Sequence, residues 1–176
     1  MFKKNCYRSA IFSLVVFLLH PPAGAQVAQP TMSEKPGTDS AITIHQETDV
    51  KASPAQLYQV LMSSRGFSDC TKKSFPSFSA ASAKIDAVAG GSFSLFDGHI
   101  VGRILELVPN ERIVEAWRVV DWPAGIYSIA RFEFRSNGTG TTVVFDHTGF
   151  PPGLKAHLSD GWQEHYWDAL SKYFEK

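Results

Sequence analysis

The sequence of 176 residues lacks several features that would identify a function directly. It has only two cysteines, Cys6 and Cys70, which excludes a framework of several disulfide bonds. Its formal net charge is zero, and the absence of a basic cluster argues against a nucleic-acid-binding surface. Its apolar run at residues 10–19 is too short for a transmembrane helix, which needs about 20 residues. The fold must therefore be held together by an apolar core.

Signatures of catalysis and of cofactor binding are also missing. The sequence contains no Gly-x-Ser-x-Gly, no His-Glu-x-x-His and no glycine loop of the kind that binds phosphate. A metal site needs converging ligands, whereas the histidines beyond the N-terminal segment are scattered: His45, His99, His147, His157 and His165. Cys70 has no neighbouring motif of a nucleophile. We therefore predict no catalytic residue, no metal and no cofactor, and interpret Cys70 as a partly buried thiol.

The N-terminus has the organisation of a secretory signal peptide. Three basic residues within 3–8 precede the apolar run, and residues 23–25, Ala-Gly-Ala, supply small side chains for cleavage before Gln26. An uncleaved N-terminal anchor is the alternative. Cleavage would leave no transmembrane anchor, and 14 basic against 17 acidic residues, a net charge of −3. We predict an exported protein, periplasmic or secreted, in which residues 26–41 form a flexible leader without a fold of their own.

The folded domain is predicted to span residues 42–176 and to begin with one strand and two helices. Apolar and polar residues alternate over 42–50, the period of a strand with one buried face. Ser53-Pro54 has the form of a helix N-cap followed by proline at the first helical position, and it predicts a helix to about residue 63. A short second helix or turn is expected around residues 65–70.

A series of antiparallel strands is predicted after the helices. Asp97-Gly98 and Asn137-Gly138 are typical of type I′ hairpin turns, whose two central residues need positive φ. An edge strand is expected to begin near Phe75-Pro76 and Phe78, and a short strand is expected at 85–88. The turns separate runs that we interpret as longer strands at 91–97, 99–108, 111–120, 126–135 and 139–148.

The last segment, 154–174, is predicted to form one long helix. Its apolar residues recur at intervals of three and four: Leu158, Trp162, Tyr166, Ala169, Leu170 and Tyr173. Strands grouped together with helices at the ends predict an α+β domain. The most economical packing is a curved antiparallel sheet of about seven strands around the long C-terminal helix, with a candidate cavity between sheet and helix.

Four stretches of the domain carry specific motifs: GGSFSLFDGHIVGRILELVPNERIVEAWR at 90–118, WPAGIYS at 122–128, GTTVVFDHTGFP at 140–151 and GWQEHYWDALSKYF at 161–174. They closely resemble the C-terminal domain of activators of the heat-shock-protein-90 ATPase, which belongs to the START-like (Bet v 1-like, SRPBCC) superfamily. The resemblance covers about residues 42–176. It implies the helix-grip fold, with the order β-α-α-β(6)-α, and a protein partner of the chaperone type.

The cavity between sheet and helix is the candidate ligand site, because pockets are mostly apolar with a few placed polar groups. Leu158, Trp162 and Tyr166 are expected to face it from the helix. Strand alternation places a second set of apolar side chains on the concave face of the sheet: Phe93, Leu95, Ile104, Ile113, Trp117, Phe132, Phe134, Val143 and Phe145. The alternative for each of these residues is that it only fills the core.

Three polar residues are candidates for the interior of this cavity. Glu106, Glu115 and His147 each lie in register with apolar neighbours of their strand, and a rim position or a structural role is the alternative for each. Trp122, in the Trp-Pro loop, and Phe67, near the second helix, are expected at the mouth of the cavity. Fourteen residues are predicted to contact the ligand: these five, the three residues of the helix, and Phe93, Leu95, Ile104, Trp117, Phe132 and Phe145 of the sheet.

Three classes of function fit these features. The first is a protein that binds a small hydrophobic molecule or lipid in the cavity, and the second is a protein-interaction module that acts on a protein partner. The third is a cyclase- or hydrolase-like enzyme, in which His147 and one of the two glutamates would serve as acid and base. A continuous cavity of roughly 300 Å³ or more would favour a ligand. A cleft filled by Trp117, Trp162 and Tyr166 would favour the interaction module.

Overall fold

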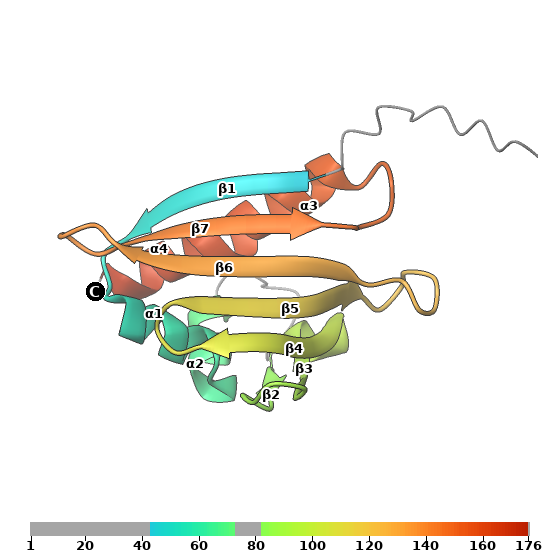
Figure 1. Cartoon of the computed structure of the whole chain (residues 1–176), viewed down its shortest axis with the longest axis horizontal. Coiled ribbons are helices and arrows are strands. Elements are labelled where there is room, and N and C mark those ends of the chain that lie inside the picture. Colours follow the sequence, from blue (N-terminus) through green and yellow to red (C-terminus); the bar gives the residue numbers. More distant parts are fainter. Residues whose placement is uncertain (1–42, 73–81, 176) are drawn as a thin grey trace, which may run out of the picture. The chain divides into compact units, whose positions relative to one another are not determined.

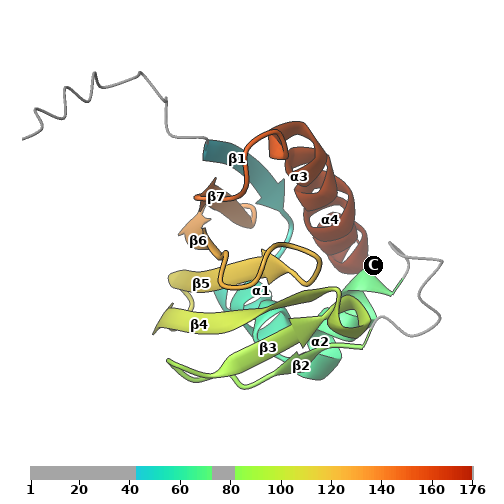
Figure 2. The same ribbon diagram turned by 90° about the vertical axis from the view of Figure 1, so that its right-hand side faces the viewer.

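The computed structural model describes residues 43–72 and 82–175, and these form an antiparallel sheet that curves around a C-terminal helical segment (Figure 2). The described chain runs through one strand, two helices, six strands and the final helical segment. The predicted α+β helix-grip architecture is therefore confirmed. The predicted signal peptide, the leader and the edge strand near Phe75-Pro76 and Phe78 lie outside the described residues.

The sheet has the spatial order β1-β7-β6-β5-β4-β3-β2, and every neighbouring pair is antiparallel. Figure 1 shows the longer strands side by side, with the first strand of the chain next to the last. The strands are β1 Thr43–Val50, β2 Lys84–Ile85, β3 Ser92–Leu95, β4 Ile100–Val108, β5 Arg112–Val119, β6 Ser128–Ser136 and β7 Thr141–Thr148. The predicted short strand at 85–88 ends earlier, because the backbone turns back after Ile85 and the amide of Val88 donates to the carbonyl of Asp86.

Two of the predicted hairpins are confirmed, although their turns are longer than expected. The connection between β3 and β4 has four residues, 96–99, and contains the 3₁₀ turn η1 Phe96–Gly98, in which Asp97 and Gly98 have φ of 55° and 91°. The connection between β6 and β7 also has four residues, 137–140, with Gly138 at φ 84°. The Asp-Gly pair has positive φ at both residues, whereas in the Asn-Gly pair only Gly138 does, so the prediction of two-residue type I′ turns was wrong.

Two short helices follow β1 and begin at serine caps. In α1 Pro54–Leu61, the Ser53 hydroxyl accepts from the Gln56 amide, and the Gln56 side chain accepts from the Ser53 amide, a capping box that satisfies two N-terminal donors. The cap of α2 Ser64–Thr71 is Ser63, whose hydroxyl accepts from the Gly66 amide. Helix α1 packs against β6, and α2 packs against the C-terminal segment.

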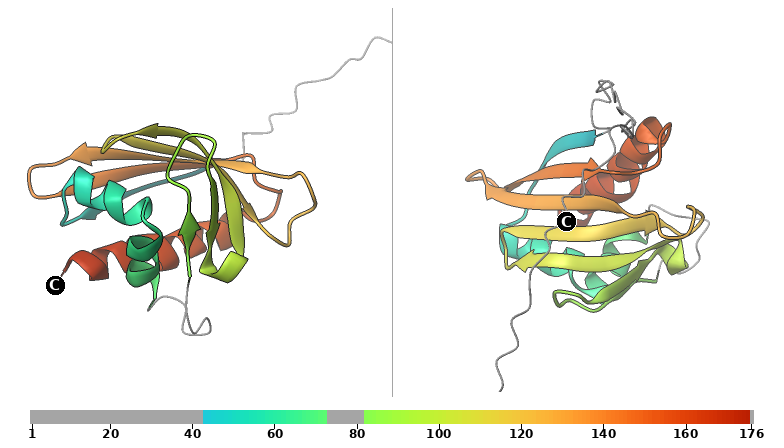
Figure 3. Two further views of the ribbon diagram at one scale, coloured as in Figure 1. Left: turned by 90° about the horizontal axis from the view of Figure 1, so that it is seen from below. Right: turned by 45° about the vertical axis from the view of Figure 1, so that its right-hand side comes forward.

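The C-terminal segment is helical throughout, but it is not a uniform α-helix. It consists of α3 Lys155–Trp162, one π-helical turn Gln163–Trp167 (η2) and α4 Asp168–Phe174. The π turn adds a residue to one turn, and the consecutive residues Tyr166 and Trp167 are both buried. Figure 3 shows this segment lying across the concave side of the sheet. Among the described helices, none has both the length and the apolar composition needed to cross a membrane.

Candidate functional site

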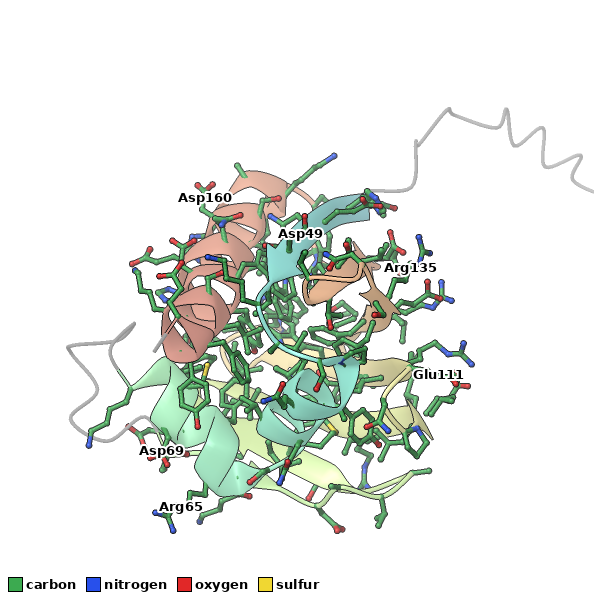
Figure 4. The ribbon with its side chains drawn as sticks, turned by 90° about the vertical axis from the view of Figure 1, so that its left-hand side faces the viewer. Asp49, Arg65, Asp69, Glu111, Arg135 and Asp160 are labelled. Atoms are coloured by element: carbon green, nitrogen blue, oxygen red, sulfur yellow. The ribbon has the colours of Figure 1, made fainter. Side chains whose placement is uncertain are left out.

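The concave face of the sheet carries the apolar residues that strand alternation predicts. Leu158, Trp162 and Tyr166 of the C-terminal segment are buried opposite them. The side chains fill the space between sheet and helix, whereas labelled charged residues such as Asp49, Arg135 and Asp160 point outward (Figure 4). The buried residues of the sheet are Phe93, Leu95, Ile104, Ile113, Trp117, Phe132, Phe134, Val143 and Phe145, so their predicted burial is confirmed.

Aromatic rings fill the middle of the cleft. The Trp162 ring lies 5.4 Å from the ring of Trp117, 4.2 Å from that of Tyr166 and 4.3 Å from that of Phe145, measured between centroids. Rings at such distances are in direct contact. The cleft therefore does not form the continuous cavity of roughly 300 Å³ that a larger ligand requires. Two separate spaces remain at its ends.

The larger space, called here the outer pocket, has a volume of about 140 Å³. It lies between the start of β4, the end of β5 and one side of α3 and η2. Most of its lining atoms are apolar, and three histidines contribute to its wall. It is lined by Phe96, His99, Ile100, Trp117, Val119, His157, Leu158, Gly161, Trp162, His165 and Tyr166.

The smaller space, called here the inner cavity, has a volume of about 10 Å³, which is close to the size of one water molecule. Tyr166 lines both spaces and thus separates them. Glu115 is the only residue of the inner wall that carries an ionisable group besides Tyr166. The wall consists of Leu61, Met62, Phe67, Ile85, Phe93, Leu95, Ile113, Glu115, Phe132 and Tyr166.

The predicted ligand residues are thus divided among several environments. Four of them line the outer pocket: Trp117, Leu158, Trp162 and Tyr166. Six line the inner cavity, with Tyr166 common to both: Phe67, Phe93, Leu95, Glu115, Phe132 and Tyr166. Five line neither space: Ile104, Glu106, Trp122, Phe145 and His147.

The two residues expected at the mouth of the cavity lie elsewhere, and that prediction was wrong. Trp122 is only 8% exposed and packs edge-on against Trp117, with ring centroids 5.5 Å apart. The Arg118 side chain donates to the Trp122 carbonyl and ties the Trp-Pro loop to β5. Phe67 is also buried, between Phe96 and Tyr166. Both are core residues because each of these large rings finds aromatic partners.

The interior position predicted for Glu106 was also wrong, and a β-bulge explains the error. The pairing of β4 with β5 shifts between Ile104 and Glu106, so that Glu106 lies opposite Val114 and not in the row of Ile104. The extra residue of a bulge reverses the alternation of side chains. The Glu106 side chain is 46% exposed and forms an ion pair with Arg112 at 2.6 Å, and that hydrogen bond lowers the pKa of its carboxyl.

The prediction that His147 is interior is correct, but its ring lines neither space. It is fully buried and both ring nitrogens are engaged. The Trp162 indole N–H donates to Nδ1 at 2.9 Å, so the neutral ring carries its proton on Nε2 and donates it to the Ser128 hydroxyl at 2.6 Å. That hydroxyl donates in turn to the Trp117 carbonyl at 2.9 Å. Burial lowers the pKa of His147 to about 3, and the ring stays neutral at physiological pH.

Glu115 is interior as predicted, and its surroundings differ completely from those of His147. Only 7% of the residue is exposed, and within the described chain its carboxyl has no hydrogen bond or ion pair. Burial raises the pKa of Glu115 to about 8, so the carboxyl is mostly protonated at neutral pH. Burial also raises the pKa of Tyr166, and the nearby Glu115 charge adds to that effect.

Seven residues of the outer pocket were missed by sequence reasoning: Phe96, His99, Ile100, Val119, His157, Gly161 and His165. One signal could have found part of this set. His157, Gly161 and His165 recur at intervals of four along the segment predicted as a helix, so they share one face beside Leu158 and Trp162. In residues 43–72 and 82–175, no three His, Cys, Asp or Glu side chains are grouped so that they could hold a metal ion.

Comparison with known sequences identifies relatives over most of this domain. The profile of the family described as "Activator of Hsp90 ATPase homolog 1-like protein" matches residues 51–175. The human protein "Activator of 90 kDa heat shock protein ATPase homolog 1" is 29% identical over 122 residues, which are 69% of this chain and 34% of the human one. The homologue from Dictyostelium discoideum is 29% identical over 150 residues, which are 82% of this chain and 35% of the relative. The chain thus spans about a third of the length of these relatives.

Solved structures have the same fold. An HSP90 activator from Plasmodium falciparum superposes with a TM-score of 0.68 at 22% identity, covering 76% of this chain and 96% of the other. At this level of identity, the likeness supports the fold alone.

Proposed function

We propose, from the premise that the chain belongs to the family of Activator of Hsp90 ATPase homolog 1-like proteins, that its domain binds a small apolar molecule in the outer pocket. The observation that carries this proposal is the pocket itself, about 140 Å³ with a mostly apolar lining. A protein cavity of about 150 Å³ that is lined by Leu, Ile and Phe binds benzene. The pocket therefore fits a single ring, and a lipid, which needs more space, is no longer proposed.

The expected affinity follows from the area that such a ligand can bury. A single ring buries about 150 Å² of apolar surface, which at roughly 25 cal/mol per Å² corresponds to about 4 kcal/mol. This free energy corresponds to a Kd on the order of 1 mM. Binding would therefore be weak for an unsubstituted ring, and polar groups of the ligand would have to supply further affinity.

Filling the pocket tests this proposal. Gly161 lies within α3, lines the outer pocket, and a Cβ atom added there meets no atom within 4 Å. We expect Gly161→Leu to occupy the pocket and to weaken the binding of ethylbenzene, followed by NMR titration, at least tenfold. Gly161→Ala is the matched control, because it adds one methyl group and removes the same helix-interior glycine. Ethylbenzene that does not bind the wild type, or binds Gly161→Leu equally well, would count against the proposal.

Binding, and not catalysis, is the role proposed for the domain. His147 makes hydrogen bonds through both ring nitrogens, Glu106 lies on the outer face, and Glu115 lies two strands away from His147. Neither glutamate therefore supports the acid–base pair that an enzyme of this kind would need. Export is proposed on the signal peptide alone. Recovery of the protein from the cell envelope with Gln26 as its first residue would support export, whereas an intact N-terminus in the cytosol would contradict it.

A protein partner is the second candidate function, since the filled centre of the cleft leaves little room for cargo. An exposed apolar patch favours it: Val120, Ile126, Tyr127 and Ile129, each 39–49% exposed, lie at and beside the connection from β5 to β6. The relatives' names indicate an ATPase of the Hsp90 type as the partner to test. We expect Ile126→Glu to abolish stimulation of such an ATPase. Val88→Glu, at an apolar residue between β2 and β3 that is 54% exposed against 40% for Ile126, is the control.

A further inference from the structure

The convex face of the sheet, which points away from the C-terminal helical segment, carries an excess of arginine. Figure 3 shows the helices on the other side of the sheet, so none of those within residues 43–72 and 82–175 covers this face. Apart from the buried Glu115, the charged residues of β4, β5 and β6 are five arginines and two glutamates, a net charge of +3, and these strands contain no lysine. Each arginine is next to a buried residue of its strand, and alternation therefore turns it outward: Arg103, Arg112, Arg118, Arg131 and Arg135.

The positive charge of this face is only partly neutralised. Glu106 and Glu133 form ion pairs with three of the arginines. The other two have no carboxylate partner within the described chain: Arg103 donates to the carbonyl of Gly90, and Arg118 donates to three backbone carbonyls. Because a carbonyl carries no net charge, the face attracts anionic groups.

Apolar side chains lie exposed among these arginines. Ile129 of β6 is 39% exposed and Leu105 of β4 is 49% exposed. Ile129 pairs with Ala116, which pairs with Arg103, and Arg131 follows two residues later on the same face of β6. Ile129 thus has an arginine on two sides. Protein interfaces are enriched in Arg and depleted of Lys, so this composition favours a protein over a membrane as the partner.

The neighbouring strands limit where an anionic partner can lie. The charged residues of β1 and β7 are Glu47, Asp49 and Asp146, and neither strand contains Lys or Arg. Like charges repel a partner from this half of the face and confine it to β4, β5 and β6. The face is also convex, because the sheet curves around the C-terminal segment. A flat, rigid surface would touch little of it, whereas an extended segment can follow the curvature.

We propose that the convex face of β4, β5 and β6 binds an extended acidic segment of a partner protein. Carboxylates of the segment pair with Arg103 and Arg131, whose guanidinium groups fit a carboxylate in a bidentate manner, and an apolar side chain of the segment packs on Ile129. The inference is independent of the outer pocket, which lies between the sheet and α3. It rests on the second candidate function, a protein partner, and names the chemistry of that partner.

Two synthetic peptides form a matched pair of probes, one with glutamates on both sides of a phenylalanine and one with glutamines in their place. By NMR titration of the wild type, we expect the glutamate peptide to bind about tenfold more tightly and to shift amide signals of β4, β5 and β6 but not of β1. Its affinity should fall about fivefold between roughly 20 and 300 mM salt, because salt screens charges at a surface. Equal affinity of the two peptides, or shifts confined to the other side of the sheet, would overturn the inference.

Charge reversal tests the two arginines. Arg103→Glu and Arg131→Glu should each weaken the binding of the glutamate peptide about tenfold while leaving the binding of ethylbenzene unchanged. Arg65→Glu makes the same charge change on α2, at a side chain that is 92% exposed, and should keep the affinity of the wild type. Full affinity in both Arg103→Glu and Arg131→Glu would contradict the proposal, and the titration of the wild type decides it should either variant fail to fold.

Two further outcomes separate this inference from its alternatives. Binding to vesicles of phosphatidylcholine and phosphatidylglycerol, without binding to the glutamate peptide, would replace the protein partner by a membrane and overturn the inference. If the glutamate peptide does not bind while Ile126→Glu still abolishes stimulation of an ATPase of the Hsp90 type, the acidic segment is refuted and the second candidate function stands.

Discussion

Two ionisable side chains face the C-terminal helical segment from the same cross-strand row of the sheet. Glu115 on β5 pairs with Ala130 on β6, and Ala130 pairs with His147 on β7. Successive strands lie about 4.8 Å apart, so the two groups are on the order of 10 Å from each other. Both are buried and both are mostly uncharged at neutral pH. They differ in whether their polar atoms form hydrogen bonds.

The hydrogen bonds around His147 are complete, whereas those around Glu115 are not. His147 belongs to a chain in which each donor has an acceptor, from Trp162 through the imidazole and Ser128 to the Trp117 carbonyl. Glu115 has no such partner among the described residues, and the nearby Tyr166 hydroxyl has no hydrogen bond of normal geometry. A satisfied buried network stabilises one arrangement of a core. We therefore assign His147 to the architecture of the core, whereas Glu115 and Tyr166 form a part of the core whose polar groups are not fully satisfied.

The largest expected effect on stability comes from breaking the hydrogen-bond chain at His147. His147→Leu leaves the buried Trp162 N–H without an acceptor and removes the Nε2–H bond to Ser128. We expect a loss of about 3 kcal/mol in the free energy of unfolding, since each unsatisfied buried group costs about 1–3 kcal/mol. Urea denaturation at pH 6.5 measures the loss. His45→Leu, at an exposed position of β1, should leave the midpoint near that of the wild type. Equal urea midpoints for His147→Leu and the wild type would show that this hydrogen-bond chain does not stabilise the fold.

The pH dependence of stability separates the two regions, because their pKa values move in opposite directions. The pKa of Glu115 is raised from 4.5 to about 8, so its contribution to stability is complete below pH 4.5 and is lost as the pH rises to 8. The pKa of His147 is lowered from 6.5 to about 3, so stability is lost as the pH falls from 6.5 towards 3. A single group changes the stability by up to about 1.4 kcal/mol per pH unit.

Between pH 6.5 and 8, only Glu115 of this pair contributes a slope, and we expect the wild type to lose about 2 kcal/mol. Glu115→Gln should remove this loss. Between pH 4.5 and 6.5 the two slopes oppose each other in the wild type, so the same variant should reveal the His147 contribution as a stability that rises with pH. Urea titrations at several pH values measure both. Glu106→Gln, at an exposed glutamate, is the control and should follow the wild type. A curve of stability against pH for Glu115→Gln that runs parallel to that of the wild type would refute the assignment of the slope to Glu115.

The smallest of these effects is expected at the end of the hydrogen-bond chain. Ser128→Ala removes the acceptor of the His147 N–H and the donor to the Trp117 carbonyl, but it leaves the Trp162–His147 bond in place. We expect a loss of about 1 kcal/mol, clearly less than for His147→Leu, by urea denaturation. Ser171→Ala, on α4 outside both spaces, provides the control. A loss equal to that of His147→Leu would mean that the chain acts as one unit through Ser128.

The comparison between Glu106 and Glu115 illustrates where reading the sequence fails. Both glutamates follow an apolar alternation along their strands, and alternation alone predicts that both face the interior. The bulge at Leu105 shifts the register of β4, so that Glu106 reaches solvent and Arg112, while the regular pairing of β5 with β6 keeps Glu115 inside. A bulge depends on how two strands meet, and neither strand carries that information by itself.

The residues of the outer pocket illustrate a second kind of failure. Trp117, Leu158, Trp162 and Tyr166 were predicted from their periods, but the histidines and Gly161 were not. Periodicity identifies apolar residues that face a core, and it does not locate the point at which packing stops. That point depends on the sizes of Trp117, Trp162 and Tyr166, which contact one another across the cleft and leave space on only one side.

The order of strands and helices, the curved sheet with its C-terminal helix and the burial of the apolar face could all be predicted from the sequence, because they depend on local periods, turn residues and caps. Three features became visible only in the folded protein: aromatic rings fill the cleft, a bulge turns Glu106 outward, and His147 has hydrogen-bond partners while Glu115 has none. These outcomes depend on side chains that meet from distant parts of the chain, where volume and hydrogen-bond geometry select one arrangement.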